Sequence, residues 1–167
     1  MTGIFANAQK EFNETSMKLY HFTAKHLLDG ILKEGLTKGA IPLITPQGLK
    51  YATPVQWLTT NKDFNQIWNT RQNISYDRND VRLTVKIPNT ELGRNLIKWT
   101  DFIAIPEMQA TAQNLNDKEG DFNNWYIYAG VVKKHWIRKY HYNIVSFANG
   151  SKIQFADVTE SYQSKEL

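Results

Sequence analysis

The sequence predicts a single domain of the α+β class. Short alternating or apolar segments of strand length recur along the chain, one helix follows the first of them, and two more follow a later one. This order differs from the regular alternation of strands and helices that builds a parallel sheet. The 167 residues, 41% of them hydrophobic, suit one domain with its own core. We expect a polar extension over 1–16, the domain over 17–156 and a polar tail over 157–167.

The first third of the chain predicts a strand, a helix and two further strands. KLYHFT at 18–23 reads as a strand, and Thr23 is a candidate N-cap for the helix AKHLLDGILKEG at 24–35. That helix carries an apolar stripe at helical spacing and ends at a glycine; its residues are Leu27, Leu28, Ile31, Leu32 and Gly35. IPLITP at 41–46 reads as a short strand or an extended loop, and VQWLTT at 55–60 as a further strand.

The remainder predicts a strand, two helices and a final group of strands. DVRLTVKIP at 80–88 alternates between apolar and polar positions, as a half-buried strand does. We predict a helix over 90–105 and a second over 106–116, which Pro106 begins. WYIYAGVV at 125–132 reads as a buried strand. The segment 137–155 reads as a strand followed by a hairpin, with its turn at Asn149-Gly150.

Composition excludes several classes of protein. The chain has no cysteine, which rules out disulfides, zinc–thiolate sites and a cysteine nucleophile. Its four histidines lack the spacing of a metal site, so we expect no metal. No apolar run approaches the ~20 residues that span a bilayer, and the N-terminus lacks the apolar core of a secretory signal. We therefore expect a cytoplasmic protein without a membrane partner, whose net charge of +4 favours anionic ligands.

The stretch LYHFT is the first candidate for a functional site. In a strand, Tyr20 and Phe22 share one face, while His21 and Thr23 share the other. A histidine at a strand end can hydrogen-bond a ribose hydroxyl, and a threonine hydroxyl can add a second contact. The alternative is that His21 only packs and Thr23 only caps the following helix.

Two later stretches have a similar character. WLTT places Trp57, Thr59 and Thr60 at the end of a predicted strand, although threonine is common in strands for its branched shape alone. WYIYAG places aromatic side chains on both faces of another strand. Arg82, on the polar face of DVRLTVKIP beside Lys86, is a candidate to hold a diphosphate; otherwise it is a solvent-facing strand residue.

Taken together, LYHFT…LLDGILKEGL, then WLTT, then WYIYAGVVKKHWI resemble, in order and spacing, proteins of the ADP-ribosyltransferase fold, in particular a group of small bacterial proteins. The resemblance covers roughly residues 17–140. It implies a mixed α/β fold in which a split pair of sheets grips NAD as a substrate, with no metal.

The resemblance also implies roles for individual residues. His21 matches a histidine that binds a ribose of NAD, and Thr23 follows it at the turn. Thr59 and Thr60 match small hydroxyl residues that support the nicotinamide pocket. Tyr20, Trp57 or Trp68 is then placed to stack on the nicotinamide ring.

One departure from the family pattern concerns the catalytic carboxylate. Transferases of this fold place a glutamate at the start of the late strand, where its charge stabilises the transition state. Here that position falls near Trp125 and holds no glutamate, whereas Glu119 and Asp121 lie shortly upstream in a predicted loop. Either can supply the charge, or both are solvated loop residues.

Three functions therefore remain open. The first is an NAD-dependent enzyme that transfers ADP-ribose to an unknown protein or nucleic-acid acceptor, with His21, Glu119 and Asp121 as catalytic candidates. The second is a nucleotide- or RNA-end-binding module without turnover. The third is an RNA 2′-phosphotransferase that uses His21, Arg82 and Arg138.

The stretch KKHWIRKYHY at 133–142 interleaves cations with aromatic side chains. This composition suits contacts with single-stranded nucleic acid, through phosphate attraction and base stacking. It also suits a charged edge strand that resists aggregation.

Overall fold

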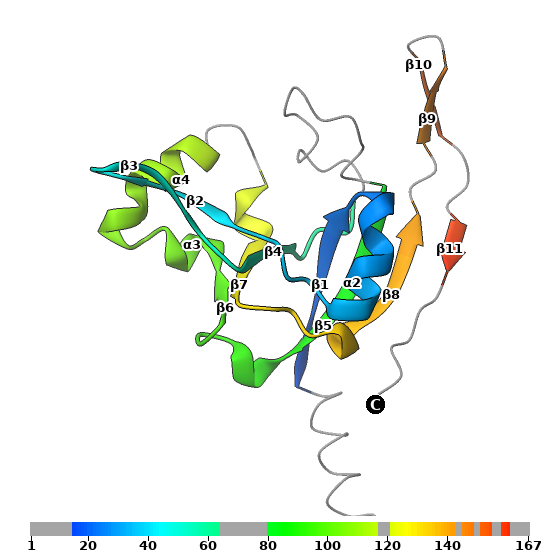
Figure 1. Cartoon of the computed structure of the whole chain (residues 1–167), viewed down its shortest axis with the longest axis horizontal. Coiled ribbons are helices and arrows are strands. Elements are labelled where there is room, and N and C mark those ends of the chain that lie inside the picture. Colours follow the sequence, from blue (N-terminus) through cyan, green and yellow to red (C-terminus); the bar gives the residue numbers. More distant parts are fainter. Residues whose placement is uncertain are drawn as a thin grey trace, which may run out of the picture.

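A seven-stranded antiparallel sheet forms the centre of the molecule (Figure 1). The computed structural model describes residues 15–63, 80–116, 121–142, 145–148, 151–154 and 158–160. The strand order of the central sheet is β11-β8-β5-β1-β4-β7-β6, and all six pairings within it are antiparallel. Two separate hairpins, β2–β3 and β9–β10, complete the strands. This arrangement confirms the α+β class.

The bounds of the elements are as follows. The central sheet contains β1 (Ser16–Thr23), β4 (Val55–Thr59), β5 (Val81–Pro88), β6 (Leu96–Lys98), β7 (Trp125–Ala129), β8 (Ile137–Tyr142) and β11 (Val158–Glu160). The hairpins are β2 (Ile41–Thr45) with β3 (Gly48–Ala52), and β9 (Val145–Ala148) with β10 (Ser151–Gln154). The α-helices are α2 (Leu28–Glu34), α3 (Trp99–Phe102) and α4 (Gln109–Asn116). Short 3-10 helices are η1 (Lys25–Leu27), η3 (Asn89–Glu91), η4 (Pro106–Met108), η5 (Phe122–Asn124) and η6 (Lys134–Trp136).

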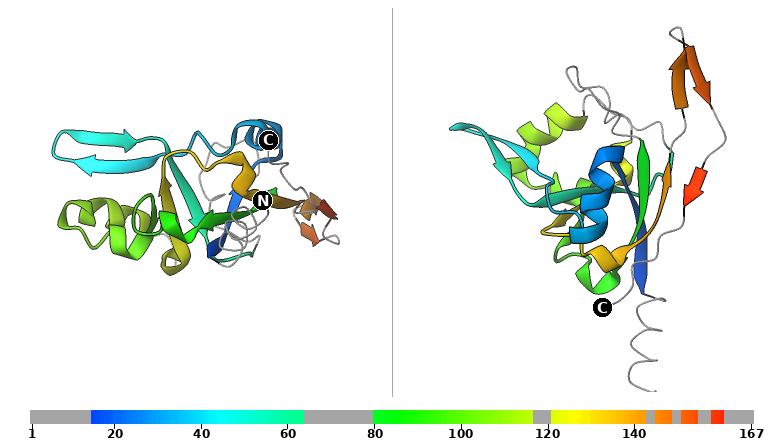
Figure 2. Two further views of the ribbon diagram at one scale, coloured as in Figure 1. Left: turned by 90° about the horizontal axis from the view of Figure 1, so that it is seen from below. Right: turned by 45° about the vertical axis from the view of Figure 1, so that its right-hand side comes forward.

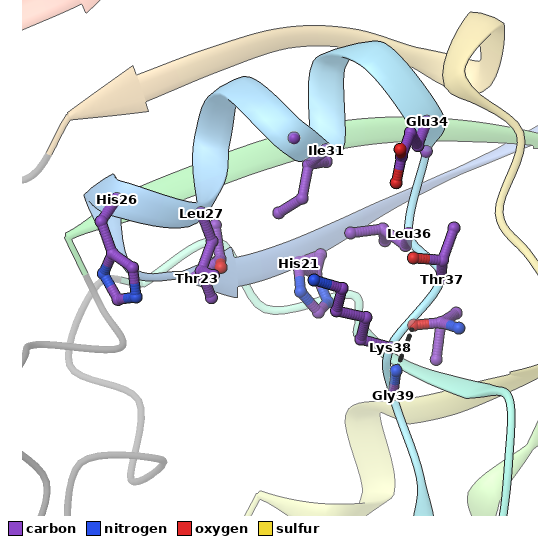
Figure 3. Close-up of a pocket in the computed structure, with 13 residues that line it drawn as sticks. His21, Thr23, His26, Leu27, Ile31, Glu34, Leu36, Thr37, Lys38 and Gly39 are labelled. Carbon is purple, nitrogen blue, oxygen red and sulfur yellow. Dashed lines mark hydrogen bonds between the residues drawn. The ribbon is translucent and has the colours of Figure 1, made fainter.

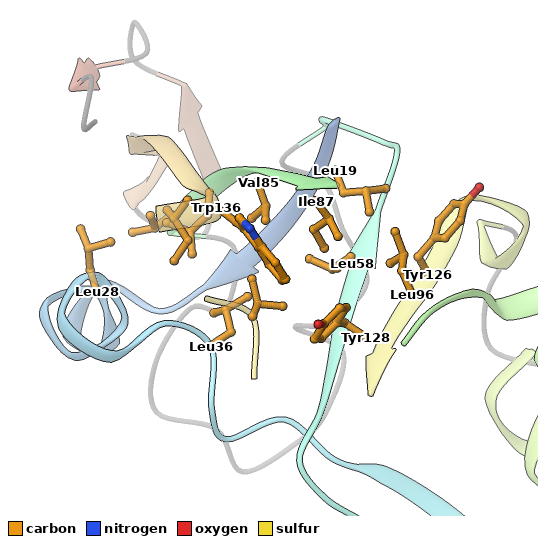
Figure 4. Close-up of a cluster of buried hydrophobic side chains, with 14 residues drawn as sticks. Leu19, Leu28, Leu36, Leu58, Val85, Ile87, Leu96, Tyr126, Tyr128 and Trp136 are labelled. Carbon is orange, nitrogen blue, oxygen red and sulfur yellow. The ribbon is translucent and has the colours of Figure 1, made fainter. Parts of the chain in front are cut away.

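The sheet has two unlike faces. On the face covered by α2, hereafter the α2 face, Leu19, Leu58 and Val85 pack with Leu28 of the helix and with Trp136 (Figure 4). A second cluster lies on the other side of β4 and β7, where Trp99 and Trp125 pack with aliphatic side chains. Figures 1 and 2 show α3 and α4 beside β6, β7 and the β2–β3 hairpin. We call this side of the sheet the opposite face.

The alternation predicted for residues 80–88 is confirmed. Every second side chain of β5 is fully buried on the α2 face, namely Val81, Leu83, Val85 and Ile87. The short helix predicted over 106–116 is also confirmed as η4 and α4. The predicted hairpin exists as β9 and β10, while its turn, Asn149-Gly150, lies outside the described residues.

The helix predicted over 90–105 is wrong. This segment instead contains η3, strand β6 and the one-turn helix α3. Leu96 packs in the cluster on the α2 face and Trp99 in the cluster on the opposite face. Residues three positions apart lie on the same side of a helix. Because Leu96 and Trp99 lie on different faces of the sheet, a continuous helix does not fit, and residues 96–98 pair with β7 as a strand before α3 begins.

Two boundaries also differ from expectation. Thr23 is the last residue of β1, and the N-cap position before η1 belongs to Ala24, which makes no side-chain capping bond. Residues 158–160, placed in the polar tail by the sequence, form β11 and pair with β8. Strand β8 is therefore an inner strand of the sheet rather than the charged edge strand of the alternative interpretation. Within the described part of the chain, no helix is long and apolar enough to cross a membrane.

The glycine at the end of α2 allows the chain to turn out of the helix and to pass close to the segment that follows β7. Gly35 has φ +85°, and a Cβ atom there would overlap the carbonyl oxygen of Val132. Leu36 and Val132 form a two-way backbone bridge at 3.0 Å in each direction directly after this turn. The turn thus fixes the path of residues 35–39 across the sheet.

We predict that Gly35→Ala lowers the free energy of unfolding by about 2 kcal/mol or more, because left-handed strain alone costs about 1–2 kcal/mol. Gly30→Ala is the matched control, since a Cβ atom there meets nothing within 4 Å and alanine favours a helix by about 0.5–1 kcal/mol. Urea denaturation measures both. Equal stability of the two variants would contradict the account of this turn.

Candidate functional site

A cavity of about 370 Å³ lies between β1, α2 and the segment 35–39 (Figure 3). Its walls combine apolar side chains of the helix with polar side chains of the strands and the segment. The lining residues that matter here are His21, Thr23, Ile31, Glu34, Lys38 and Gln56. A volume of this size falls within the range of small-molecule sites, which is about 300–1,000 Å³.

His21 presents a defined hydrogen-bonding state to this cavity. Its Nδ1 lies 2.7 Å from the carbonyl oxygen of Trp57 on the neighbouring strand β4. A carbonyl oxygen only accepts hydrogen bonds, so Nδ1 carries the proton and donates it. Burial lowers the pKa of His21 below its usual 6.5, outweighing the opposing effect of that bond. The imidazole is therefore neutral near pH 7, and Nε2 is an acceptor for a ligand hydroxyl.

Gln56 fixes the wall opposite α2. This side chain is 2% exposed, and its amide bridges two backbone segments. Its Oε1 accepts from the Gly39 N–H at 3.0 Å, while its Nε2 donates to the Gly130 carbonyl at 3.1 Å. A Cβ atom at position 39 would lie 2.6 Å from that Oε1. The segment that carries Thr37 and Lys38 is therefore tied to β4 through Gln56.

Sequence reasoning missed several residues of this cavity. Glu34, Lys38, Thr37 and Gln56 all line it. Glu34 follows Leu27 and Ile31 at helical spacing, so the face of α2 that carries it was readable from the sequence. Gln56 and the 35–39 segment gave no such signal, because their placement depends on contacts with Gly130 and Val132 far along the chain.

The structure does not bring together all the site residues that the sequence suggested. His21 and Thr23 line the cavity. Tyr20 pairs with Thr59, and paired residues of neighbouring antiparallel strands point to the same side. Because side chains alternate along β1, Thr59 lies on the face away from His21. The expectation that His21 and Thr59 surround one sugar does not hold in this arrangement.

Trp57 and Arg82 also lie on the opposite face. Trp57 packs against Trp99 and Trp125, at centroid distances of 4.9 and 5.7 Å, and its indole N–H donates to the Ala40 carbonyl at 2.9 Å. Arg82 lies over the ring of Tyr20, 5.4 Å from its centroid, and donates to the Lys62 carbonyl at 2.8 Å. These contacts give Trp57 a structural role in the second cluster.

Asp121 belongs to a hydrogen-bond network at the end of β4. Its two carboxylate oxygens accept from Asn61 at 3.2 Å and from Asn124 at 2.6 Å. Thr60 donates to the side-chain oxygen of Asn124 at 3.1 Å, and the Thr59 hydroxyl accepts from the Asn61 N–H at 3.0 Å. The network ties the end of β4 to η5. Two other candidates, Glu119 and Trp68, lie outside the described residues.

The stretch 133–142 does not present its cations and aromatic rings on one surface. Trp136 is buried against Tyr128, and its ring also contacts Lys133. In β8, Tyr140 and Tyr142 pack on the α2 face, while the register places Lys139 and His141 on the opposite face. The stretch therefore contributes separately to the two sides of the sheet.

Comparisons of the chain with protein-family models, with curated proteins and with solved structures found no match. Within the described residues, no group of three or more His, Asp or Glu side chains is placed to hold a metal ion. The relation to the ADP-ribosyltransferase fold and the absence of a metal both stay predictions.

The lowered pKa of His21 predicts a pH dependence of stability. Above pH 6.5 the imidazole is neutral in both states. Below pH 6.5 the imidazole of the unfolded chain binds a proton before that of the folded chain does. The free energy of unfolding therefore decreases as the pH falls towards the pKa of His21 in the folded state. His21→Asn keeps an N–H donor near the position of Nδ1 and removes the titration. We expect the wild type to lose stability relative to this variant as the pH falls below about 7, measured by urea denaturation at a series of pH values. The same dependence of stability on pH in both proteins would contradict this.

Proposed function

We propose that the chain binds a nucleotide in the cavity beside His21, and that NAD is the ligand. The observation that carries this proposal is the neutral imidazole, held by the Trp57 carbonyl with its second nitrogen as an acceptor in the cavity wall. A ribose hydroxyl is the complementary donor. Thr23 and Thr37 add hydroxyl groups to the same cavity, and Lys38 supplies a positive charge suited to a diphosphate.

The size of the cavity indicates how a dinucleotide would fit. About 370 Å³ accommodates one nucleoside rather than a whole dinucleotide. The ligand would then place one ribose at His21 and extend out of the cavity past exposed Glu34 and Lys38. Apolar side chains of α2, including Ile31, offer a surface for a flat ring.

The resemblance to the ADP-ribosyltransferase fold suggests what the bound NAD undergoes. The bond between C1′ of the ribose and the nicotinamide nitrogen breaks, and its electron pair leaves with nicotinamide. A nucleophile of the acceptor then forms a bond to C1′ and gives up its proton. A carboxylate close to the ribose favours this step by its charge. Glu34 is the one carboxylate among the described residues that line the cavity, so we assign this role to it.

A second candidate is a binding module without turnover. Asp121 was a candidate for the catalytic carboxylate, but both of its oxygens accept hydrogen bonds from Asn61 and Asn124 at the end of β4. These bonds give Asp121 a structural role, which favours binding without turnover. The RNA 2′-phosphotransferase alternative has less support. It needs His21 and Arg82 around one phosphate, whereas Arg82 pairs with Phe22 and so lies on the opposite face from His21.

We predict that His21→Asn weakens NAD binding at least about tenfold, because one hydrogen bond to a ligand is worth about 1–1.5 kcal/mol and its loss leaves the ribose hydroxyl unpaired. Thr59→Val is the matched control, since Thr59 lies on the opposite face. Isothermal titration calorimetry with NAD and ADP-ribose measures both variants. Equal losses in the two variants, or no heat with the wild type, would contradict the assignment of the cavity.

Chromatography of the same mixtures, with cell extract added, separates the two candidate functions. Release of nicotinamide that depends on Glu34, tested with Glu34→Gln, supports the transferase. Binding of NAD without any release supports the binding module.

A further inference from the structure

The three strands β1, β5 and β8 form an unusually basic part of the sheet. Their sequences, SMKLYHFT, VRLTVKIP and IRKYHY, contain no aspartate or glutamate. They contain five lysine or arginine residues, which are Lys18, Arg82, Lys86, Arg138 and Lys139. These strands are neighbours in the order β8-β5-β1, so these five cationic residues lie on adjacent strands.

The register gathers three of the lysines on one face. Lys18 lies directly opposite Lys86, and Lys139 lies opposite Thr84, two residues before Lys86 on the same strand. All three positions are on the opposite face, away from α2. Lys18 and Lys139 are exposed and Lys86 is half-buried. Since neighbouring strands are about 4.8 Å apart, the three lysines span about 10 Å.

An aromatic ring lies within this group of cations. Tyr20 is half-buried, pairs with Thr84, and carries the guanidinium of Arg82 over its ring. We call the surface made by Lys18, Tyr20, Arg82, Lys86 and Lys139 the basic sheet face. In the described part of the chain, α3 packs mainly against β6, β7 and η5, and α4 mainly against β2 and η4 (Figure 2).

The juxtaposition of Lys18 and Lys86 is unfavourable without a partner. Like charges at directly opposed positions of an antiparallel pair destabilise the sheet. An anion that bridges them would turn repulsion into attraction, and a chain of anions would also reach Lys139. The net charge of +4 attracts such a polyanion from a distance.

The chemistry of the surface favours one class of polyanion. A membrane surface calls for exposed large apolar side chains, such as Trp, Phe or Leu, beside the cations. On this face of the three strands, the one residue of that kind is Phe22, and it is buried. The residues at these positions are Ser16, Lys18, Tyr20, Phe22, Arg82, Thr84, Lys86, Pro88, Lys139 and His141. A broad sheet does not enter a groove of duplex DNA, which admits a helix or a two-stranded ribbon. Single strands bind along cationic surfaces and stack bases on aromatic rings.

We propose that the basic sheet face binds single-stranded nucleic acid. The lysines contact successive phosphates, and Tyr20, with the guanidinium of Arg82 over its ring, receives a base. This surface lies on the other side of the sheet from the cavity of His21, so its occupation does not depend on the proposed nucleotide site.

Fluorescence anisotropy with a labelled oligo(dT) or oligo(rU), longer than the ~4–16 nucleotides that one domain contacts, tests the proposal. The test variant combines Lys18→Gln, Lys86→Gln and Lys139→Gln. The control combines Lys33→Gln, Lys50→Gln and Lys98→Gln, three exposed lysines on α2, β3 and β6. Both lose the same charge. Thermal melting of both variants excludes misfolding, and the test variant is expected to melt no lower than the wild type because it relieves the repulsion between Lys18 and Lys86.

At about 50 mM salt we expect the test variant to bind at least tenfold more weakly than the wild type and the control to keep most of its affinity. The slope of log Kd against log salt should fall by about 2 in the test variant, since each lost phosphate contact contributes about 0.7 for single strands. Equal losses in both variants would overturn the proposal. So would absence of wild-type binding, or equal binding of a duplex of the same length or of phosphatidylserine vesicles.

Discussion

The central position of β1, between β5 and β4, determines on which side of the molecule each candidate residue lies. Successive side chains of a strand point to opposite faces, and β1 separates two unlike environments. Leu19, His21 and Thr23 face α2 and the cavity. Lys18 and Tyr20 face the other way, where the register joins them to Lys86 and Thr84. One strand of eight residues thus contributes to a candidate nucleotide site and to a basic surface.

The bond from His21 to the Trp57 carbonyl connects this strand to the chemistry of the cavity. It crosses from β1 to β4, selects which imidazole nitrogen carries the proton, and leaves the other as an acceptor. The same strand β4 contains Gln56, whose side-chain oxygen accepts a hydrogen bond from the Gly39 N–H in the segment that lines the cavity. Strand pairing, the state of the imidazole and the width of the cavity therefore depend on the same pair of strands.

The sequence revealed those parts of the fold that depend on local pattern. The alternation of residues 80–88 was readable because every apolar position of β5 packs in one cluster. The helix predicted over 90–105 failed because Leu96 and Trp99 belong to clusters on different faces, which no local pattern reveals. In the candidate site, alternation placed His21 with Thr23, whereas the position of Thr59 required the pairing of Tyr20 with Thr59. Gln56 escaped notice because its partners, Gly39 and Gly130, are distant in sequence.

The state of the His21 ring is the central claim, and nitrogen-15 NMR of the imidazole tests it most directly. We expect Nδ1 to show the shift of a protonated, pyrrole-type nitrogen and Nε2 that of an unprotonated, pyridine-type nitrogen at pH 7. Addition of NAD should move the Nε2 resonance and leave Nδ1 largely unchanged. A proton on Nε2, or an Nε2 resonance that does not respond to NAD, would contradict the account.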